Sequence, residues 1–239
     1  MKRQLAFDLA APPSYRREDF HVTASNALAL RSIDGWAGWP MGKLALIGPE
    51  GSGKTHLARI WAAEAGATVV PGAGMSPEDV PPLAAVGHVA VEDAARVAGR
   101  PEAERGLLHL HNLLLAEGGR LLLTARTPPA RWPVALPDLA SRLAATPTAR
   151  LDPPDDALLA AVLAKLFADR QVRVAPGLID WLVRRMERSL AAARLLVAQL
   201  DAIALAEGGA VTRTLAARVL DSGETRPNST ETSNPGHYP

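Results

Sequence analysis

Cysteine is absent from the 239-residue sequence, which excludes disulfides, thiolate metal sites and a cysteine nucleophile. Aromatic residues make up only 4% of the chain, which argues against a stacking platform for single-stranded nucleic acid. The net charge of +1 shows no strong basic excess, so composition does not require electrostatic binding to nucleic acid. No apolar run approaches the roughly 20 residues of a membrane span, and the N-terminus lacks the apolar region of a signal peptide. We therefore expect a soluble, cytoplasmic protein with no membrane partner.

A complete G-x-x-x-x-G-K-[ST] phosphate loop occupies residues 48–55, between the apolar run 44–47 and a helical pattern. Glycines let consecutive backbone N–H groups turn inward around a polyphosphate, and the following helix directs its positive dipole end at the same anion. We predict that Lys54 binds the β- and γ-phosphates and that the Thr55 hydroxyl binds Mg²⁺. The nucleotide-binding residues expected here are Gly48, Pro49, Glu50, Gly51, Ser52, Gly53, Lys54, Thr55 and His56.

Strand-like and helical stretches alternate between residues 14 and 152, which predicts an α/β domain with a parallel sheet flanked by helices. The expected strands are 44–47, 67–70, 88–91, 120–124 and 146–151, and the expected helices are 25–33, 54–65, 102–116 and 138–143. Residues 153–221 show helical patterns only, at about 155–169, 176–187, 189–206 and 212–220, and predict a small all-helical lid domain. Residues 222–239 are polar without periodicity, so we expect a disordered tail.

Two acids follow the predicted strand at 88–91 and are candidates for holding Mg²⁺ beside the phosphates. Glu92 stands where phosphate-loop NTPases usually have aspartate, and its longer side chain would shift the metal by roughly an ångström, enough to slow hydrolysis on the order of 100-fold. If the register slips by one residue, Asp93 becomes the metal acid and Ala94 leaves the water-orienting position empty. Thr124 ends another buried strand, and in such folds this residue lies between the metal acid and the γ-phosphate. We therefore expect weak ATPase activity at most.

Together these residues resemble the AAA+ family, and within it the branch of the bacterial replication initiator DnaA. The phosphate loop continues into His56-Leu57, as in the G-K-T-H-L of that branch, and the two acids are followed by Ala98-Gly99. Pro128-Pro129 follow Thr124 as they follow the first sensor strand of the branch. Residues 137–143 are very close to its P-D-L-x-S-R-hydrophobic box. The resemblance covers residues 4 to about 220, and the joint occurrence of these motifs in order makes it specific.

The resemblance implies a P-loop AAA+ sheet, a helical lid, and bound ADP or ATP with Mg²⁺. It places the family's arginine finger, which completes a neighbour's active site, on Arg142. It places the second sensor on Arg188, with Arg194 less favoured, and the adenine-side motif on Ser25 and Asn26. Arg126 departs from the branch, which usually has aspartate there, and this cation either binds phosphate or faces solvent.

Within the N-terminal segment 1–13, residues 4–9 resemble the short peptide with which a regulator of this branch binds the sliding clamp of the replicative polymerase. Gln4 would meet polar groups, and Leu5, Phe7 and Leu9 would enter an apolar groove. After the lid, the initiator continues into a helix-turn-helix domain, whereas this sequence ends in a polar tail, so we expect no direct sequence-specific DNA binding. Self-association into a homodimer is left open.

Two functions follow from these patterns. In the first, a nucleotide-bound regulator binds the clamp and DnaA, and Arg142 stimulates hydrolysis of the initiator's ATP, which represses replication initiation. In the second, an AAA+ ATPase acts directly on nucleic acid, as a helicase-loading factor does. The near-neutral charge and Glu92 argue against the second.

Overall fold

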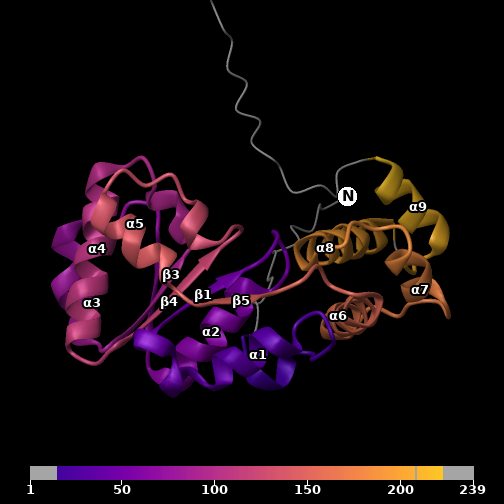
Figure 1. Ribbon diagram of the computed structural model, residues 1–239. Helices are drawn as coiled ribbons and strands as arrows, with labels where there is room; N and C mark the ends of the chain where they lie inside the picture. The colour runs from indigo at the N-terminus through magenta and orange to yellow at the C-terminus, as the bar shows by residue number, and fades with distance from the viewer. Residues whose placement is uncertain (1–14, 208, 223–239) are drawn as a thin grey trace, which may run out of the picture.

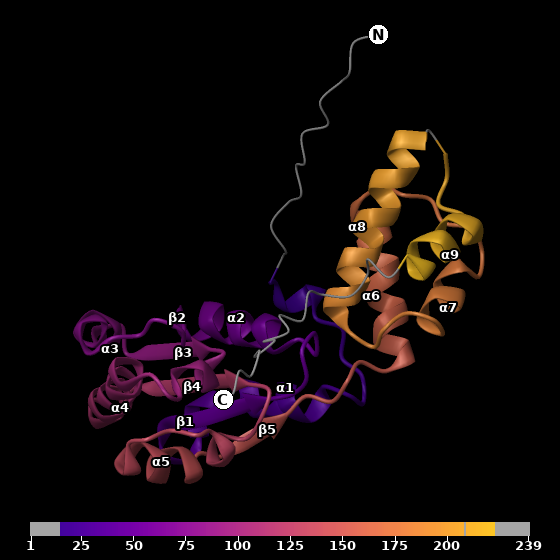
Figure 2. The same ribbon diagram turned by 90° about the horizontal axis from the view of Figure 1, so that it is seen from above.

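The computed structural model describes residues 15–207 and 209–222. They form an α/β unit followed by a helical unit beside it, as Figure 1 and Figure 2 show from two directions. The predicted clamp peptide, and residues 223–239 of the predicted tail, lie outside the described residues. Among the helices that are described, none is long and apolar enough to cross a bilayer.

The α/β unit is built on five parallel strands in the order β2-β3-β4-β1-β5. The strands are β1 (Lys43–Ile47), β2 (Thr68–Pro71), β3 (His88–Glu92), β4 (Arg120–Ala125) and β5 (Thr148–Arg150). Ile47 ends β1 opposite Ala125 of β4 and Arg150 of β5. Because β1 lies between two other strands, the phosphate loop that follows it emerges from within the carboxyl edge, where α/β sheets bind ligands.

Helices cover both faces of the sheet, which explains why its strands are apolar on both sides. The helices of this unit are α1 (Ala27–Asp34), α2 (Lys54–Ala65), α3 (Val80–Ala85), α4 (Pro101–Ala116) and α5 (Pro137–Ala144). Val89 and Val91 of β3 pack in the cluster that includes α3, α4 and α5, whereas Ala90 between them packs with α1 and α2. This alternation confirms the predicted parallel sheet flanked by helices.

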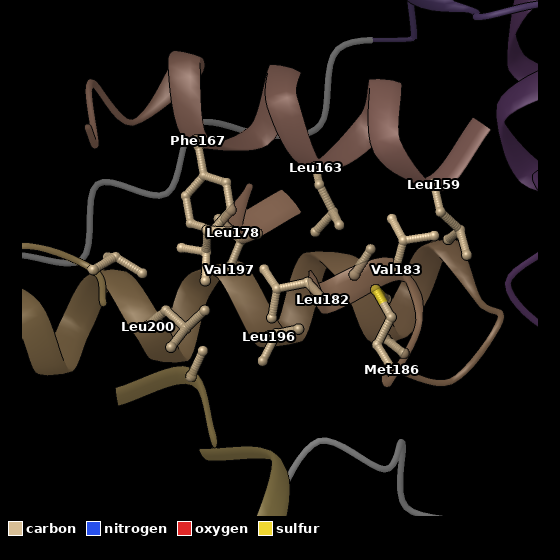
Figure 3. Close-up of a cluster of buried hydrophobic side chains, with 14 of the residues drawn as sticks. Leu159, Leu163, Phe167, Leu178, Leu182, Val183, Met186, Leu196, Val197 and Leu200 are labelled. Carbon is tan, nitrogen blue, oxygen red and sulfur yellow. The ribbon is translucent and has the colours of Figure 1, made fainter. Parts of the chain in front are cut away.

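The helical unit has a hydrophobic core of its own, shown in Figure 3. It contains α6 (Asp156–Asp169), α7 (Leu178–Val183), α8 (Leu190–Glu207) and α9 (Arg213–Asp221). Leu163 and Phe167 of α6 lie over Leu196 and Leu200 of α8, and all four are almost fully buried. Helices α6 and α9 begin as the sequence predicts, because the side chains of Asp155 and Thr212 accept hydrogen bonds from backbone N–H groups in the first turn of each helix.

Three elements differ from the sequence predictions. Strand β5 covers only Thr148–Arg150 of the expected 146–151, and α7 ends at Val183 rather than Glu187. Helix α3 was not predicted; it carries Pro81-Pro82 in its first turn, where prolines sacrifice no intrahelical hydrogen bond.

Candidate functional site

The phosphate loop forms a tight turn between β1 and α2. Gly51 and Gly53 have φ values of 70° and 103°, a backbone region that favours glycine. Lys54 is 9% exposed and donates from Nζ to the carbonyl oxygens of Gly48 (2.9 Å) and Pro49 (2.7 Å). The ammonium group is therefore held against the loop by acceptors that a phosphate oxygen can replace.

The loop is chemically suited to a polyphosphate. A Cβ at Gly48 would lie 2.5 Å from the carbonyl oxygen of Leu151, so this position accepts only glycine. Ser52 Oγ is buried and has no hydrogen-bond partner within the described part of the chain. Thr55, in the first turn of α2, is exposed, and hydroxyl and carboxylate oxygens are ligands suited to Mg²⁺. The residues present thus fit a nucleotide with Mg²⁺.

Of the two predicted metal acids, Asp93 is the one whose charge acts on the pKa of Lys54. Burial lowers the pKa of Lys54, and the charge of Asp93 partly opposes this effect. Asp93 has a left-handed φ of 48°, and its N–H donates to Thr124 Oγ1 at 3.1 Å. Glu92 instead lies 4.0 Å from Arg59 of α2. The structure therefore brings Lys54, Asp93 and Thr124 together.

Arg126 pairs with Glu50 of the phosphate loop. Sequence left open whether this cation binds phosphate or faces solvent, and here it joins the end of β4 to the loop. Both side chains are more than half exposed, so the pair contributes little to stability. Their charges nevertheless reach Lys54, because Arg126 lowers and Glu50 raises its pKa as smaller effects than burial and Asp93.

The predicted adenine-side residues shape the loop before α1. Asn26, 3% exposed, donates from Nδ2 to the carbonyl oxygen of His21 (2.8 Å) and accepts at Oδ1 from the N–H of Thr23 (2.9 Å). The Ser25 hydroxyl lies 2.9 Å from that of Thr23. Burial acts to raise the pKa of Asp155, at the start of the helical unit, but interactions with Leu158, Thr23 and Ser25 lower it overall. Asn26 and Ser25 therefore organise this loop, and Ser25 and Thr23 lie beside the start of the helical unit.

His56 packs edge-on against the rings of Tyr15 and Phe20, at centroid distances of 5.6 and 5.4 Å. Burial lowers its pKa, and the charge of Arg194 on α8 adds to this lowering. Predicted as a nucleotide residue, His56 thus sits in a packed aromatic contact that joins α2 to the segment before α1.

The helical unit is seated directly on the phosphate loop. The N–H of Leu190 donates to the carbonyl oxygen of Gly51 at 2.8 Å, and Ser189 beside it is 2% exposed. A Cβ at Gly51 would lie 2.0 Å from Ser189 Oγ. Sequence reasoning missed Ser189, although a serine immediately before a helical pattern is an N-cap signal. Arg188, the predicted second sensor, pairs with Asp156 of α6 at 2.6 Å in this structure.

Arg142 lies near the amino-terminal end of β1, whereas the phosphate loop of its own chain follows the carboxyl-terminal end of that strand. Its carbonyl oxygen accepts a hydrogen bond of 2.8 Å from Nζ of Lys43, the first residue of β1, whereas the loop follows Ile47 at the other end. A strand rises roughly 3.3 Å per residue, so the two sites are separated by on the order of 15 Å. The Arg142 side chain is 38% exposed and pairs only with Asp138, at 3.2 Å, among the ion pairs of the described residues. It is therefore open to a partner and remote from its own loop.

His111 on α4 lies beside this arginine, and its burial predicts that acid lowers the stability of the protein. Burial, and next the charge of Lys43, lowers its pKa from 6.5 to about 4; Arg142 acts in the same direction, and Asn112 and Asp138 oppose it. Because the unfolded chain binds the proton more tightly, stability is full above about pH 6.5 and falls by roughly 3 kcal/mol as pH drops towards 4. Urea unfolding across this range should show a shallower fall for His111→Gln. Equal slopes for the two proteins would contradict the assignment.

No family model matches the chain. The chromosomal replication initiator protein DnaA of Sphingopyxis alaskensis is 31% identical over 109 residues, which are 45% of this chain and 24% of that protein. The chain thus matches about a quarter of the length of this curated relative.

Solved structures of DnaA share the fold. Domain III of Thermotoga maritima DnaA has a TM-score of 0.74 at 19% identity, covering 90% of this chain and 99% of that domain. A DnaA bound to AMPPCP and single-stranded DNA has a TM-score of 0.67 at 16% identity, covering 89% and 70%. AMPPCP-bound DnaA from Aquifex aeolicus has a TM-score of 0.65 at 16% identity, covering 82% and 67%. The chain therefore has the fold of DnaA domain III, with low sequence identity to that initiator over part of its length.

Proposed function

We propose that this chain is a negative regulator of replication initiation of the kind represented by Hda, the regulatory inactivator of DnaA. It binds the sliding clamp on DNA through its N-terminal peptide and docks against ATP-bound DnaA. Arg142 then completes the initiator's active site, where a guanidinium neutralises the charge that develops during phosphoryl transfer. Hydrolysis leaves the initiator in its ADP form.

The position of Arg142 carries this proposal. An arginine that is partly exposed and separated from its own phosphate loop by the length of β1 is poorly placed to serve the nucleotide of its own chain. The same position suits a neighbour's nucleotide, which is the role that the surrounding Pro-Asp-Leu-Ala-Ser-Arg-Leu box has in the AAA+ resemblance.

The chain's own site holds ADP or ATP in this proposal. Lys54 and the loop N–H groups bind the phosphates, and Thr55 with Asp93 or Glu92 holds Mg²⁺, which supplies positive charge against the phosphate oxygens. The bond from Leu190 to Gly51 joins the helical unit to this loop, so a bound nucleotide would order both units together. Two of the DnaA structures similar to this chain contain AMPPCP.

Replacing Lys54 by alanine should abolish nucleotide binding. The change removes the buried ammonium group that contacts the loop, so we expect affinities for ADP and ATP to fall by about 100-fold or more. The rise in melting temperature on adding ADP should disappear with it, because that rise depends on binding to the folded state. Calorimetry and thermal melts measure both. Lys165→Ala, on α6, is the matched control, and unchanged affinity and melting temperature in Lys54→Ala would refute a structural role for the nucleotide.

The clamp peptide should act as a tether. Replacing Leu5 and Phe7 by alanine removes two apolar anchors and should weaken binding to the clamp at least 10-fold. Because a tether raises effective concentration, stimulation of DnaA-bound ATP hydrolysis should fall at low concentrations of the variant and recover at high ones. Failure to recover would show that the peptide does more than tether, and unchanged clamp binding would refute its role.

The second candidate function is direct action on single-stranded DNA. One similar DnaA structure contains single-stranded DNA, which favours it. It requires clamp-independent DNA binding that weakens steeply with salt, since such binding releases counterions from phosphates. Filter binding between about 50 and 200 mM salt separates the two functions.

A further inference from the structure

Lys43 is a buried cation directly beneath the end of α5. Only 3% of it is exposed, and its Nζ donates to the carbonyl oxygen of Arg142 at 2.8 Å. The same carbonyl accepts a second hydrogen bond, of 2.9 Å, from the Thr146 hydroxyl. The main chain of Arg142 is thus fastened to the first residue of β1 and to the segment leading into β5.

Neutral groups and a helix end stabilise this ammonium group. Its second contact is His111 Nε2, at 3.0 Å. His111 is neutral near pH 7, so Nε2 accepts from Lys43 while Nδ1 carries the proton, 3.4 Å from Asn112 Oδ1. In the part of the chain that the structure describes, Lys43 has no carboxylate within ion-pair distance. The negative end of the α5 dipole supplies the remaining attraction.

Burying a cation without an anion costs folding free energy, because the charge loses its hydration. An apolar side chain of similar length would fill the same space without this desolvation penalty, so packing alone does not explain Lys43. A depression lined by Met41, Lys43, His111, Ser141 and Arg142 also leaves one side of this helix end without covering residues. Hydrogen bonds rather than surrounding side chains therefore hold the end of α5 on that side.

We propose that Lys43 is the positioning residue for Arg142. By holding the carbonyl of Arg142, with His111 as its second acceptor, it restricts the last turn of α5 and presents the guanidinium in one place. This inference rests on the proposed function, because presentation matters only if Arg142 acts on a partner. A displacement of about 1 Å is enough to lower a rate on the order of 100-fold.

The first test measures anchoring without any partner. In Lys43→Met, hydrogen exchange should accelerate about 10-fold at the amides of Ala145 and Thr146, which close the last turn of α5, and stay unchanged at Leu57 in α2. The double variant Lys43→Met, His111→Leu replaces both members of the Lys43–His111 pair by apolar groups. It leaves no buried His111 without its partner, so a loss of folding from that cause does not obscure the result. Unchanged exchange at the end of α5, or equal acceleration throughout the chain, would overturn the proposal.

The second test measures presentation. With DnaA and loaded clamp, Lys43→Met should lower the maximal stimulated hydrolysis rate by about 10- to 100-fold. The concentration giving half-maximal stimulation should stay the same, because the docking surface is intact. A merely structural role would instead lower the maximal rate and raise the concentration giving half-maximal stimulation. If the wild type fails to stimulate hydrolysis, the regulator proposal is wrong, and the exchange measurement still decides the anchoring.

Discussion

Arg142→Ala should lower the stimulated hydrolysis of DnaA-bound ATP by about 1,000-fold and leave the chain's own nucleotide affinity unchanged. The first effect follows from loss of a guanidinium supplied in trans, a contribution of roughly 10³ to 10⁵ in rate. The second follows from position, since the main chain of Arg142 meets the start of β1 and the phosphate loop follows its end. Single-turnover hydrolysis and calorimetry measure the two quantities separately.

The matched control is Arg105→Ala. Arg105 forms an exposed ion pair with Glu102 one turn away on α4, as Arg142 does with Asp138 on α5. Its removal should change neither stimulation nor stability by much, because exposed pairs of this kind contribute well under about 1 kcal/mol. Arg142→Lys keeps the charge but loses the planar fork, so it should stimulate far less than the wild type. Full stimulation by Arg142→Ala would exclude this residue as the finger.

Gly51→Ala should uncouple the helical unit from the phosphate loop. The added Cβ would lie 2.0 Å from Ser189 Oγ and 3.2 Å from the N–H of Ala191. Ser189 must then shift, which disturbs the adjacent hydrogen bond from the N–H of Leu190 to the carbonyl oxygen of Gly51. We expect nucleotide affinity to fall by about 100-fold, because the loop cannot keep its phosphate-binding turn and also fit the added methyl group against Ser189.

Gly74→Ala separates this clash from backbone strain. Gly74 has a φ of 85°, similar to the 70° of Gly51, but nothing lies within 4 Å of its added Cβ. It should lose about 1 to 2 kcal/mol from the left-handed backbone alone, with nucleotide affinity unchanged. Similar affinities for the two variants would show that contact between Ser189 and the loop is irrelevant to binding.

Local patterns predicted most of the fold. Helix α2 runs from Lys54 to Ala65 as expected, because the phosphate-loop motif and the glycine at 66 define its ends. Strands β1 to β4 were found from apolar runs, and β1, β3 and β4 are buried on both faces. Strand β5 and helix α3 were not predicted correctly. Only three residues of β5 are paired, and α3 has Pro81-Pro82 in its first turn, so each leaves a weak pattern in the sequence.

The residues that sequence did not reveal act through contacts distant along the chain. Lys43 and Arg142 are 99 positions apart, and Glu50 and Arg126 are 76 apart, so neither pair forms a local motif. The one local signal was Lys43, the first residue of the otherwise apolar strand β1. Because this lysine is buried, its charge has a structural role. The roles of Arg142 and the clamp peptide stay predictions because they depend on partner proteins, and the role of Arg188 stays one because it depends on a bound nucleotide.

The most direct measurement of the central claim is single-turnover hydrolysis of ATP already bound to DnaA, with clamp loaded on DNA. Free nucleotide is removed first. The variant Lys54→Ala serves as a comparison, because it is expected not to bind ATP in its own site. We predict that the wild-type chain accelerates the hydrolysis on the order of 1,000-fold, and that Arg142→Ala restores the unstimulated rate. An unchanged rate with the wild-type chain, while it still binds the clamp and its own nucleotide, would contradict the account.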